Sequence, residues 1–373
     1  MGKNKWVKAM EKFDAVVTER KDMFADENLL KTFSPTFNSI FGRTHGVPGG
    51  YSLVMYGPPK CGKSVISHLM IGWLHQNHPD AIAMKIDTER RSDGQLDEEA
   101  CRLYGIDEDR LVVMQTNKPK HIFDQIETKI AALCQAGAPI RLIVLDSLNG
   151  IQGRREGKND SVENVTIGDH ALTVQTGMKR ILDTIRDNNI CLVLIDQIRA
   201  ELNELERKRG NNFKMQSSFG VQHLVEYFVC VEENRNAAGR QDLEGNEFRD
   251  KAAGETSAMK IRFKMRDSTM AGYTKGREGE LTFDFRKGLV NVNEEVFLLG
   301  TRRGVITQPK QGYYDILGQT IHGAPKTLAA LKDKALQDAV IAEVIRRDMA
   351  GEYDAADKAK ADAEEAAEEA AEE

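Results

Sequence analysis

Residues 57–64 read Gly57-Pro58-Pro59-Lys60-Cys61-Gly62-Lys63-Ser64 and fit the template G-x-x-x-x-G-K-[ST] at every required position. The run follows the apolar stretch 51–56 and precedes a helical pattern that begins near Val65. Its glycines let successive backbone N–H groups face one concavity at a helix N-terminus, which attracts an anion. The lysine can reach the β- and γ-phosphates of a nucleotide such as ATP, and the serine hydroxyl can bind Mg²⁺. The stretch therefore predicts a nucleotide-binding loop, with a simple Gly-Pro turn as the alternative.

The charge of the chain is unevenly distributed. The 373 residues carry a net charge of −6, which by itself argues against a nucleic-acid partner. Residues 351–373 hold ten acidic and two basic side chains, a net charge of −8, which leaves +2 on residues 1–350. A nucleic-acid partner therefore remains open for the main part of the chain.

Cysteine usage and hydropathy predict the compartment. The five cysteines are an odd number and none belongs to a C-x-x-C pair, which indicates free thiols in a reducing environment and no zinc site. No apolar run approaches the roughly 18 residues that a membrane span needs, and the N-terminus lacks the apolar centre of a signal peptide. We expect a cytoplasmic protein without a membrane partner.

Short apolar runs alternate with helical patterns. The runs cover residues 51–56, 81–86, 111–114, 141–146 and 191–196, and the helical patterns cover about 98–104, 121–135 and 169–188. Near-continuous apolar strands joined by helices predict an α/β fold, a mainly parallel sheet with helices on both faces. The runs 227–232, 259–266 and 280–285 have no long helix between them and predict antiparallel strands added to that sheet.

Four parts are predicted along the chain. Residues 1–45 form a small N-terminal segment with an apolar-faced helix over about 1–30, which needs its own core or a neighbouring subunit to pack on. Residues 46–288 form the α/β core, and residues 289–350 form a small C-terminal α+β domain with helical pieces near 293–304 and 327–349. Residues 351–373 are rich in Ala and Glu without an apolar face, and we expect a disordered acidic tail.

Polar side chains end three of the predicted parallel strands. Asp146 emerges where ligands bind in open α/β sheets, and it is the predicted metal-linked partner of Ser64, with a helix N-cap as the alternative. Glu89 is the predicted general base for a water molecule and Asp87 the weaker choice, although either can be a solvated loop charge. Gln197 can hydrogen-bond a γ-phosphate oxygen but cannot lose a proton, so it suits a sensor of ATP.

Two polar segments with basic side chains follow these strand ends. Residues 152–168 and 198–218 hold the candidate DNA contacts Arg154, Arg155, Lys158, Arg199, Arg207, Lys208, Arg209, Phe213 and Lys214. Cations can contact phosphates, and the aromatic ring can stack on bases. A long loop inside a compact domain is usually functional, although an exposed charged helix also explains the pattern after Gln197. The two segments indicate a ligand too long for a pocket.

Several stretches, taken in order, resemble the RecA family of recombinases, and most of all the UvsX-like recombinases of bacteriophages. They are GVPGGYSLVMYGPPKCGKS, MKIDTER, LIVLDS, TIGDHALTVQTGMKRIL, LVLIDQIRAEL, KIRFKMRDSTMAGY and GYYDILGQTIHGAPK. The resemblance covers the chain from about Thr32 into the C-terminal region. Asp196 stands where many members of the family have Asn.

The resemblance implies a RecA-like P-loop ATPase that polymerises on single-stranded DNA as a helical filament and promotes strand exchange with double-stranded DNA. ATP and Mg²⁺ would lie between adjacent subunits. It implies that Glu89 activates water, that Gln197 senses the γ-phosphate, and that residues 154–168 and 198–218 are two DNA-binding loops.

The resemblance also implies contacts between subunits. Lys264 and Arg266 fall where the family places two cations that reach the γ-phosphate of the neighbour, like arginine fingers. Many relatives have two lysines there, and the exchange of Lys for Arg changes the geometry of the contact. The N-terminal helix would pack on the adjacent subunit, and the tail resembles regulatory tails of relatives. Mediator and single-strand-binding proteins are further partners that the resemblance suggests.

Two other classes of protein compete with this interpretation. A hexameric helicase shares the motor architecture, but we expect it to carry an N-terminal partner-binding domain larger than the 45 residues found here. An ATP-regulated binding protein without a DNA function is the other alternative, and the basic segment after Gln197 argues against it.

Overall fold

The computed structural model describes residues 25–91, 96–153, 168–200, 213–215, 219–235, 241–245, 247–250, 255–269 and 274–352. Most of the predicted N-terminal helix and nearly all of the predicted disordered tail lie outside these ranges. The N-terminal helix does not extend to residue 30 as predicted. Instead, residues 26–28 form the 3₁₀ turn η2 (Asp26–Asn28), and β1 (Leu29–Leu30) pairs with β2 (Val47–Pro48), which buries both leucines.

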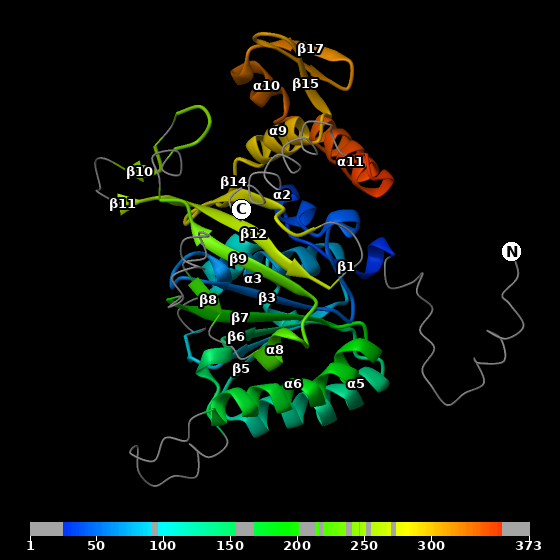
Figure 1. The fold of residues 1–373 in the computed structure, drawn as a ribbon, viewed down its shortest axis with the longest axis vertical. Coiled ribbons are helices and arrows are strands. Elements are labelled where there is room, and N and C mark those ends of the chain that lie inside the picture. Colours follow the sequence, from blue (N-terminus) through cyan, green and yellow to red (C-terminus); the bar gives the residue numbers. More distant parts are fainter. Residues whose placement is uncertain are drawn as a thin grey trace, which may run out of the picture.

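A ten-stranded sheet organises the described residues (Figure 1). Its order is β14 (Gly288–Val290), β13 (Glu278–Asp284), β12 (Ala258–Ser268), β9 (Tyr227–Glu233), β3 (Ser52–Gly57), β7 (Cys191–Ala200), β6 (Ile140–Asp146), β4 (Ile82–Asp87) and β5 (Leu111–Gln115), and β8 (Phe213–Met215) pairs with β7. The pairs from β9 to β5 are parallel, whereas β12, β13 and β14 pair antiparallel. The predicted α/β class with a mainly parallel sheet and added antiparallel strands is confirmed.

One strand runs in the direction opposite to the prediction. We expected the run 227–232 to be antiparallel to the rest, but β9 pairs parallel with β3 and antiparallel with β12. β7 and β9 run in the same direction beside β3, and α8 (Phe219–Gln222) lies between them in the sequence. The change of direction therefore falls one strand later than expected.

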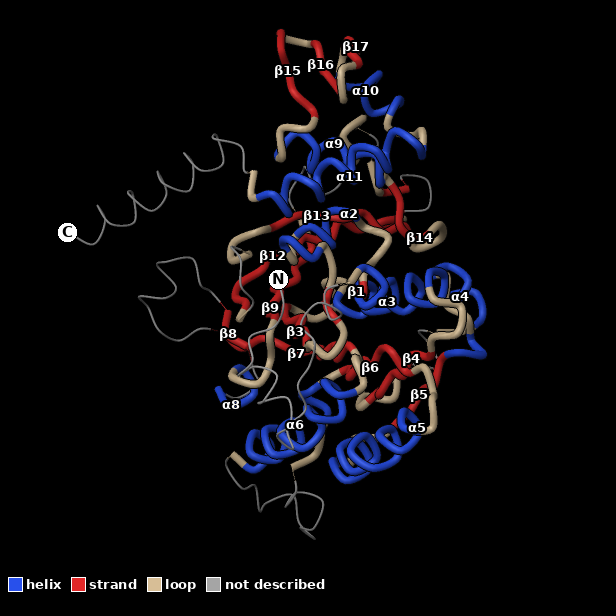
Figure 2. The backbone as a smooth tube through the Cα atoms, turned by 90° about the vertical axis from the view of Figure 1, so that its right-hand side faces the viewer, coloured by secondary structure: helices blue, strands red, loops and turns tan. Residues whose placement is uncertain are grey.

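Helices cover both faces of the sheet (Figure 2). One core contains side chains of α2 (Pro35–Ser39), α3 (Lys63–Asn77) and α4 (Glu98–Tyr104). The other contains side chains of the π-turns η6 (Lys120–Asp124) and η7 (Ile126–Ile130), of α6 (Asp169–Asp187) and of α8, and α5 (Ala131–Gln135) packs against it. Side chains of β3 alternate between the two cores, Leu53 and Met55 joining α3 while Val54 joins α6. The predicted helix over 121–135 is present, as two π-turns that run into α5.

The C-terminal region has a core of its own, above β12–β14 in Figure 1. It consists of α9 (Val292–Arg302), the antiparallel strands β15 (Ile306–Lys310), β16 (Tyr313–Ile316) and β17 (Gln319–His322), α10 (Ala324–Ala330) and α11 (Lys334–Ala350). The helical piece expected over 327–349 is two helices. The second of them, α11, begins at a side-chain cap, because Asp333 accepts from the Leu336 N–H.

The remaining short elements lie in connections. They are η3 (Gly42–Thr44), η5 (Glu108–Arg110), η8 (Leu148–Gly150) and the paired strands β10 (Arg249–Asp250) and β11 (Glu255–Thr256).

Candidate nucleotide site

The loop between β3 and α3 has the backbone of an anion nest. Lys60 and Gly62 both have positive φ, 59° and 99°, so the loop coils before α3 begins at Lys63. Gly57 is required by a close approach, since a Cβ there would lie 1.9 Å from the Val231 carbonyl oxygen of β9. The first N–H groups of α3 have no acceptor within their own helix and face the space that a phosphate would fill. The loop therefore fits an anion.

Cys61 fills the space under this loop. Its buried thiol donates to the Val231 carbonyl oxygen at 3.1 Å, and burial raises the pKa of the thiol. The small side chain thus supports the loop against β9. Pro58 is half-buried, and Pro59 and Lys60 are exposed on the outer side of the loop.

Lys63 lies folded back on the loop. Its ammonium donates to the carbonyl oxygens of Gly57 at 2.8 Å and Pro58 at 2.6 Å, and the residue is 8% exposed. These carbonyl groups are neutral acceptors, so a phosphate group would compete strongly for the same ammonium. The Lys63 ammonium is thus held at the loop, where it can bind an anion.

Ser64 and Asp146 are brought together at the start of α3. The Ser64 hydroxyl donates to Asp146 Oδ2 at 2.9 Å, and the next peptide bond, Asp146–Ser147, is cis. A hydroxyl and a carboxylate are hard oxygen donors of the type that Mg²⁺ prefers, and Mg²⁺ usually takes only one or two protein carboxylates with phosphate oxygens. The described residues contain no group of three or more His, Cys, Asp and Glu side chains that could hold a metal. The pair fits a Mg²⁺ ion that is shared with a nucleotide.

Lys85 is a residue of this site that sequence reasoning missed. It is 1% exposed on β4, and its ammonium lies 2.9 Å from His68 Nε2 and 3.7 Å from Asp146 Oδ2. Burial raises the pKa of the Asp146 carboxyl, and the Lys85 charge opposes that rise. The signal was a single lysine among the apolar residues of the run 81–86.

Glu89 meets Gln197 and Ser147 beside the strand ends. Glu89 Oε1 accepts from the Gln197 side-chain amide at 3.2 Å and from the Ser147 hydroxyl at 3.0 Å, and Glu89 Oε2 pairs with Arg91 at 2.8 Å. Two of these three partners, Ser147 and Arg91, were absent from the sequence prediction. The arrangement joins the predicted base directly to the predicted sensor.

The carboxylates of Asp87 and Asp196 accept hydrogen bonds from backbone N–H groups. The Asp87 carboxylate accepts the N–H groups of Glu89 at 3.0 Å and Arg91 at 2.6 Å and is 3% exposed, so it stabilises the turn after β4. This geometry favours Glu89 over Asp87 as a base. Asp196 is fully buried on β7 and accepts the Gln197 N–H at 2.8 Å.

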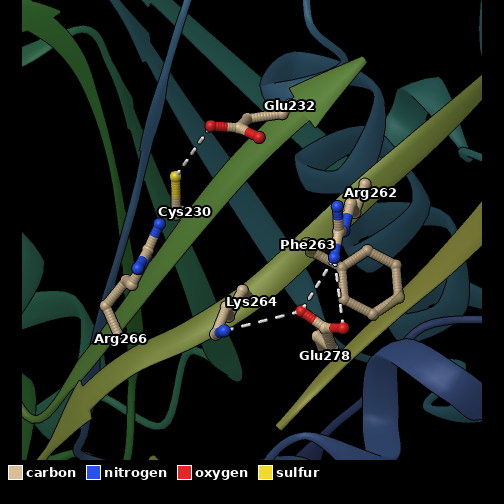
Figure 3. Close-up of a pocket in the computed structure, with 7 residues that line it drawn as sticks. All are labelled: Cys230, Glu232, Arg262, Phe263, Lys264, Arg266 and Glu278. Atoms are coloured by element: carbon tan, nitrogen blue, oxygen red, sulfur yellow. Dashed lines mark hydrogen bonds and ion pairs between the residues drawn. The ribbon is translucent and has the colours of Figure 1, made fainter. Parts of the chain in front are cut away.

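Lys264 and Arg266 lie on the other side of the sheet from the phosphate-binding loop. Ile261 and Phe263 of β12 pack in the core that contains α3, so the alternating side chains between and after them face away from it. Arg266 sits at a bulge between Met265 and Asp267, and it lines the same pocket as Lys264 (Figure 3). Within one chain, these cations and α3 therefore lie on opposite faces of the sheet.

The candidate DNA contacts are only partly described. Arg154, Arg155, Lys158, Arg207, Lys208 and Arg209 lie outside the described residues, and only the backbone is described for Arg199, Phe213 and Lys214. That backbone differs from the expected loop, because residues 198–200 of β7 pair antiparallel with residues 213–215 of β8. Residues 198–200 and 213–215, the described parts of this segment, are thus paired strands.

The RecA N-terminal domain family matches residues 14–214, more than half of the chain. The chain belongs to the RecA family. Protein RecA of Mycoplasma genitalium is 29% identical over 156 residues, which are 42% of each chain. Protein RecA of Ureaplasma parvum is 25% identical over 206 residues, 52% of this chain and 58% of that protein. Protein RecA of Cereibacter sphaeroides strain ATCC 17023 is 22% identical over 268 residues, 72% of this chain and 69% of that protein.

These similarities are distant. The match spans 42% of the length of the first two relatives, those of Mycoplasma genitalium and Helicobacter hepaticus. The matched family segment includes the phosphate-binding loop and β4, β6 and β7. The RecA-like core predicted from the sequence is thereby confirmed for this RecA-family chain.

Among the described residues, no helix combines the length and the apolar character that a membrane span needs.

Proposed function

We propose that this chain is an ATP-dependent DNA recombinase. It would polymerise on single-stranded DNA as a helical filament, promote exchange with homologous double-stranded DNA, and hydrolyse ATP under stimulation by DNA. One observation carries the proposal: the phosphate-binding loop and the ends of β7, β6 and β4 converge at one edge of the sheet in a RecA-family chain. These strand ends bring Ser64, Asp146, Glu89 and Gln197 into one site.

Each residue of the site has a separate role in the binding or hydrolysis of ATP. Residues 57–64 hold the phosphates of ATP, and Lys63 neutralises part of their charge. Ser64 and Asp146 would hold Mg²⁺, which supplies further neutralisation of the phosphates when bound. Glu89 orients and deprotonates the attacking water, and Ser147 keeps its carboxylate in place through the 3.0 Å hydrogen bond.

Gln197 links nucleotide to DNA in this proposal. Its amide donates to Glu89 in this structure, and a γ-phosphate oxygen offers it a charged alternative. Gln197 directly precedes the residues of β7 that pair with β8, so its displacement moves both ends of the proposed DNA loop. ATP would act as a binding switch, because the loop responds to the presence of the γ-phosphate. Base pairing between strands, and not the protein, would read the sequence.

The pocket would be completed by a second copy of the chain. Lys264 and Arg266 lie on the face of β12 opposite the core that contains α3, the helix that begins at Lys63. A filament in which one subunit presents this face to the loop of the next would use them as trans cations. The same proposal includes mediator and single-strand-binding proteins as partners and the cytoplasm of a bacterial or phage-infected cell as the location. It also includes a closer relationship to UvsX-like recombinases, which the order of the motifs supports.

The Lys63→Ala variant tests the proposal. We expect it to lose nucleotide-dependent binding to single-stranded DNA, measured by fluorescence anisotropy with a non-hydrolysable ATP analogue, and to lose filaments in electron micrographs. Lys129→Ala, which removes an exposed lysine of η7, is the matched control and should behave like the parent chain. Filaments of Lys63→Ala equal to those of the parent chain would refute the switch.

A further inference from the structure

A pocket of about 120 Å³ lies among β9, β12 and β13 (Figure 3). It is lined by Cys230, Glu232, Arg262, Phe263, Lys264, Arg266 and Glu278. Three cations and two carboxylates therefore share one small space. The pocket contains both proposed trans cations, and it also contains Arg262 and Glu278, which the proposed function leaves unused.

Glu278 holds two of these cations. Both of its carboxylate oxygens lie 3.1 Å from Arg262 Nη2, and its Oε2 lies 3.7 Å from Lys264 Nζ. Figure 3 shows both cations directed toward this carboxylate, whereas Arg266 lies beside Cys230. Glu278 therefore neutralises part of the charge that a phosphate would need.

The antiparallel pairing of β12 and β13 builds this contact. Lys264 and Glu278 are direct partners in the register, and Arg262 is two residues away on the same face of β12. The strand geometry itself thus places the carboxylate between two cations. The side chains of Arg262, Lys264 and Glu278 are 48%, 40% and 34% exposed, so an anion from outside can reach the two cations.

We propose that Glu278 is an intramolecular competitor for the terminal phosphate of a nucleoside triphosphate carried by a second copy of this chain, and that Arg262 is an additional cation of that contact. The inference rests on the proposed function. In the separate chain Glu278 occupies Arg262 and Lys264, and in the assembly a triphosphate, with its greater negative charge, displaces it. A nucleoside diphosphate lacks the group that would reach the cations. Glu278 would thus set how much triphosphate-loaded chain is needed before subunits associate.

The Glu278→Gln variant tests this inference in the full chain. It keeps the shape of the side chain and removes the competing charge. We expect the protein concentration at half-maximal assembly with a non-hydrolysable ATP analogue, measured by light scattering without DNA, to fall by about twofold to fivefold, the range that an exposed ion pair allows. The difference should shrink as salt is raised toward about 1 M, because salt screens exposed charges.

Two further variants test whether the effect comes from Glu278 and its two cations or from the loss of any carboxylate charge. Glu233→Gln removes an equivalent charge from β9, where Glu233 pairs with Arg235 at 2.8 Å and is 30% exposed, and it should leave the assembly concentration unchanged. Adding Glu278→Gln to Lys264→Met should lower the assembly concentration less than it does in the parent chain, because one of the two released cations is gone. An unchanged or higher concentration for Glu278→Gln alone would overturn the role of Glu278. Absence of triphosphate-dependent assembly and of DNA-stimulated turnover in the parent chain would instead overturn the proposed function.

Discussion

In the proposed site, Glu89 takes part both in ATP hydrolysis and in the contact with the γ-phosphate sensor. Glu89 is shared by Ser147 and Gln197, so the group proposed to activate water is also the group that holds the proposed sensor. A carboxylate can take a proton from water, whereas its amide analogue cannot. The two properties can therefore be separated by one substitution.

Glu89→Gln should lose ATP turnover but keep nucleotide-dependent binding to single-stranded DNA. The expected loss of turnover is about 10²- to 10⁴-fold, the usual contribution of a general base. Phosphate release and DNA anisotropy, measured on the same preparation, check the two halves. Glu98→Gln, at an exposed pair with Arg102, is the control that should leave both unchanged. Parent-like turnover by Glu89→Gln would remove this residue from the chemistry.

Glu295 couples stability to pH. It is buried on α9, where Oε2 accepts from the Ser34 hydroxyl and from the Thr36 N–H, and burial raises the pKa of the carboxyl from 4.5 to about 8. The folded chain therefore holds a proton that the unfolded chain has released between these two pH values. The free energy of unfolding must then fall as pH rises through this window, by an amount on the order of a few kcal/mol.

Glu295→Gln should flatten this dependence. Melting temperatures of the variant and the parent chain, recorded from pH 5 to pH 8, give the contribution of Glu295 as the change in their difference. Other titrating groups cancel in that difference. A difference between the two chains that stays constant over the whole range would contradict the shifted pKa.

A buried ion cluster joins elements that are distant in the sequence. Asp348, near the end of α11, accepts from His45 Nε2 at 2.7 Å, from Arg277 at 3.2 and 3.3 Å, and lies 3.1 Å from Arg303 Nε. Burial opposes ionisation of Asp348, but His45 and the two arginines keep the pKa of its carboxyl below the usual range. The cluster ties α11 to the residue after η3, the residue before β13 and the residue after α9.

Asp348→Asn should destabilise the fold by about 3–5 kcal/mol, because the buried arginines lose their counter-charge. Denaturant unfolding followed by circular dichroism measures the change. Asp338→Asn, on the same helix at an exposed pair with Lys334, should cost no more than about 1 kcal/mol. Equal effects of the two substitutions would show that the cluster contributes no special stability.

The charge distribution of the whole molecule gives the tail a role in the proposed function. Residues 351–373 carry −8 on a chain whose other residues carry +2. An anionic tail can compete with DNA phosphates for cationic surface, and free Mg²⁺ screens that competition. Removal of residues 351–373 should thus lower the Mg²⁺ concentration needed for binding to double-stranded DNA, as followed by anisotropy. An unchanged Mg²⁺ requirement would leave the tail without this role.

The sequence by itself determined the features that consecutive residues build. The loop at residues 57–64 is recognised from its own glycines, Lys63 and Ser64. Asp146 and Gln197 follow apolar runs that the sequence pattern predicts as buried strands. The α/β class follows for the same reason, because strand and helix periods are local. The family resemblance rested on the order of such local motifs.

Only the tertiary structure decided which distant side chains meet. The parallel direction of β9, the contact of Ser147 with Glu89, and the burial of Lys85 against Asp146 depend on strand order and register, which no short stretch encodes. The same holds for Glu278, whose carboxylate meets Lys264 only because β13 pairs with β12 in this register. Contacts between residues far apart in the chain are set by the packing of the whole sheet, and that packing decides the partners of each charge.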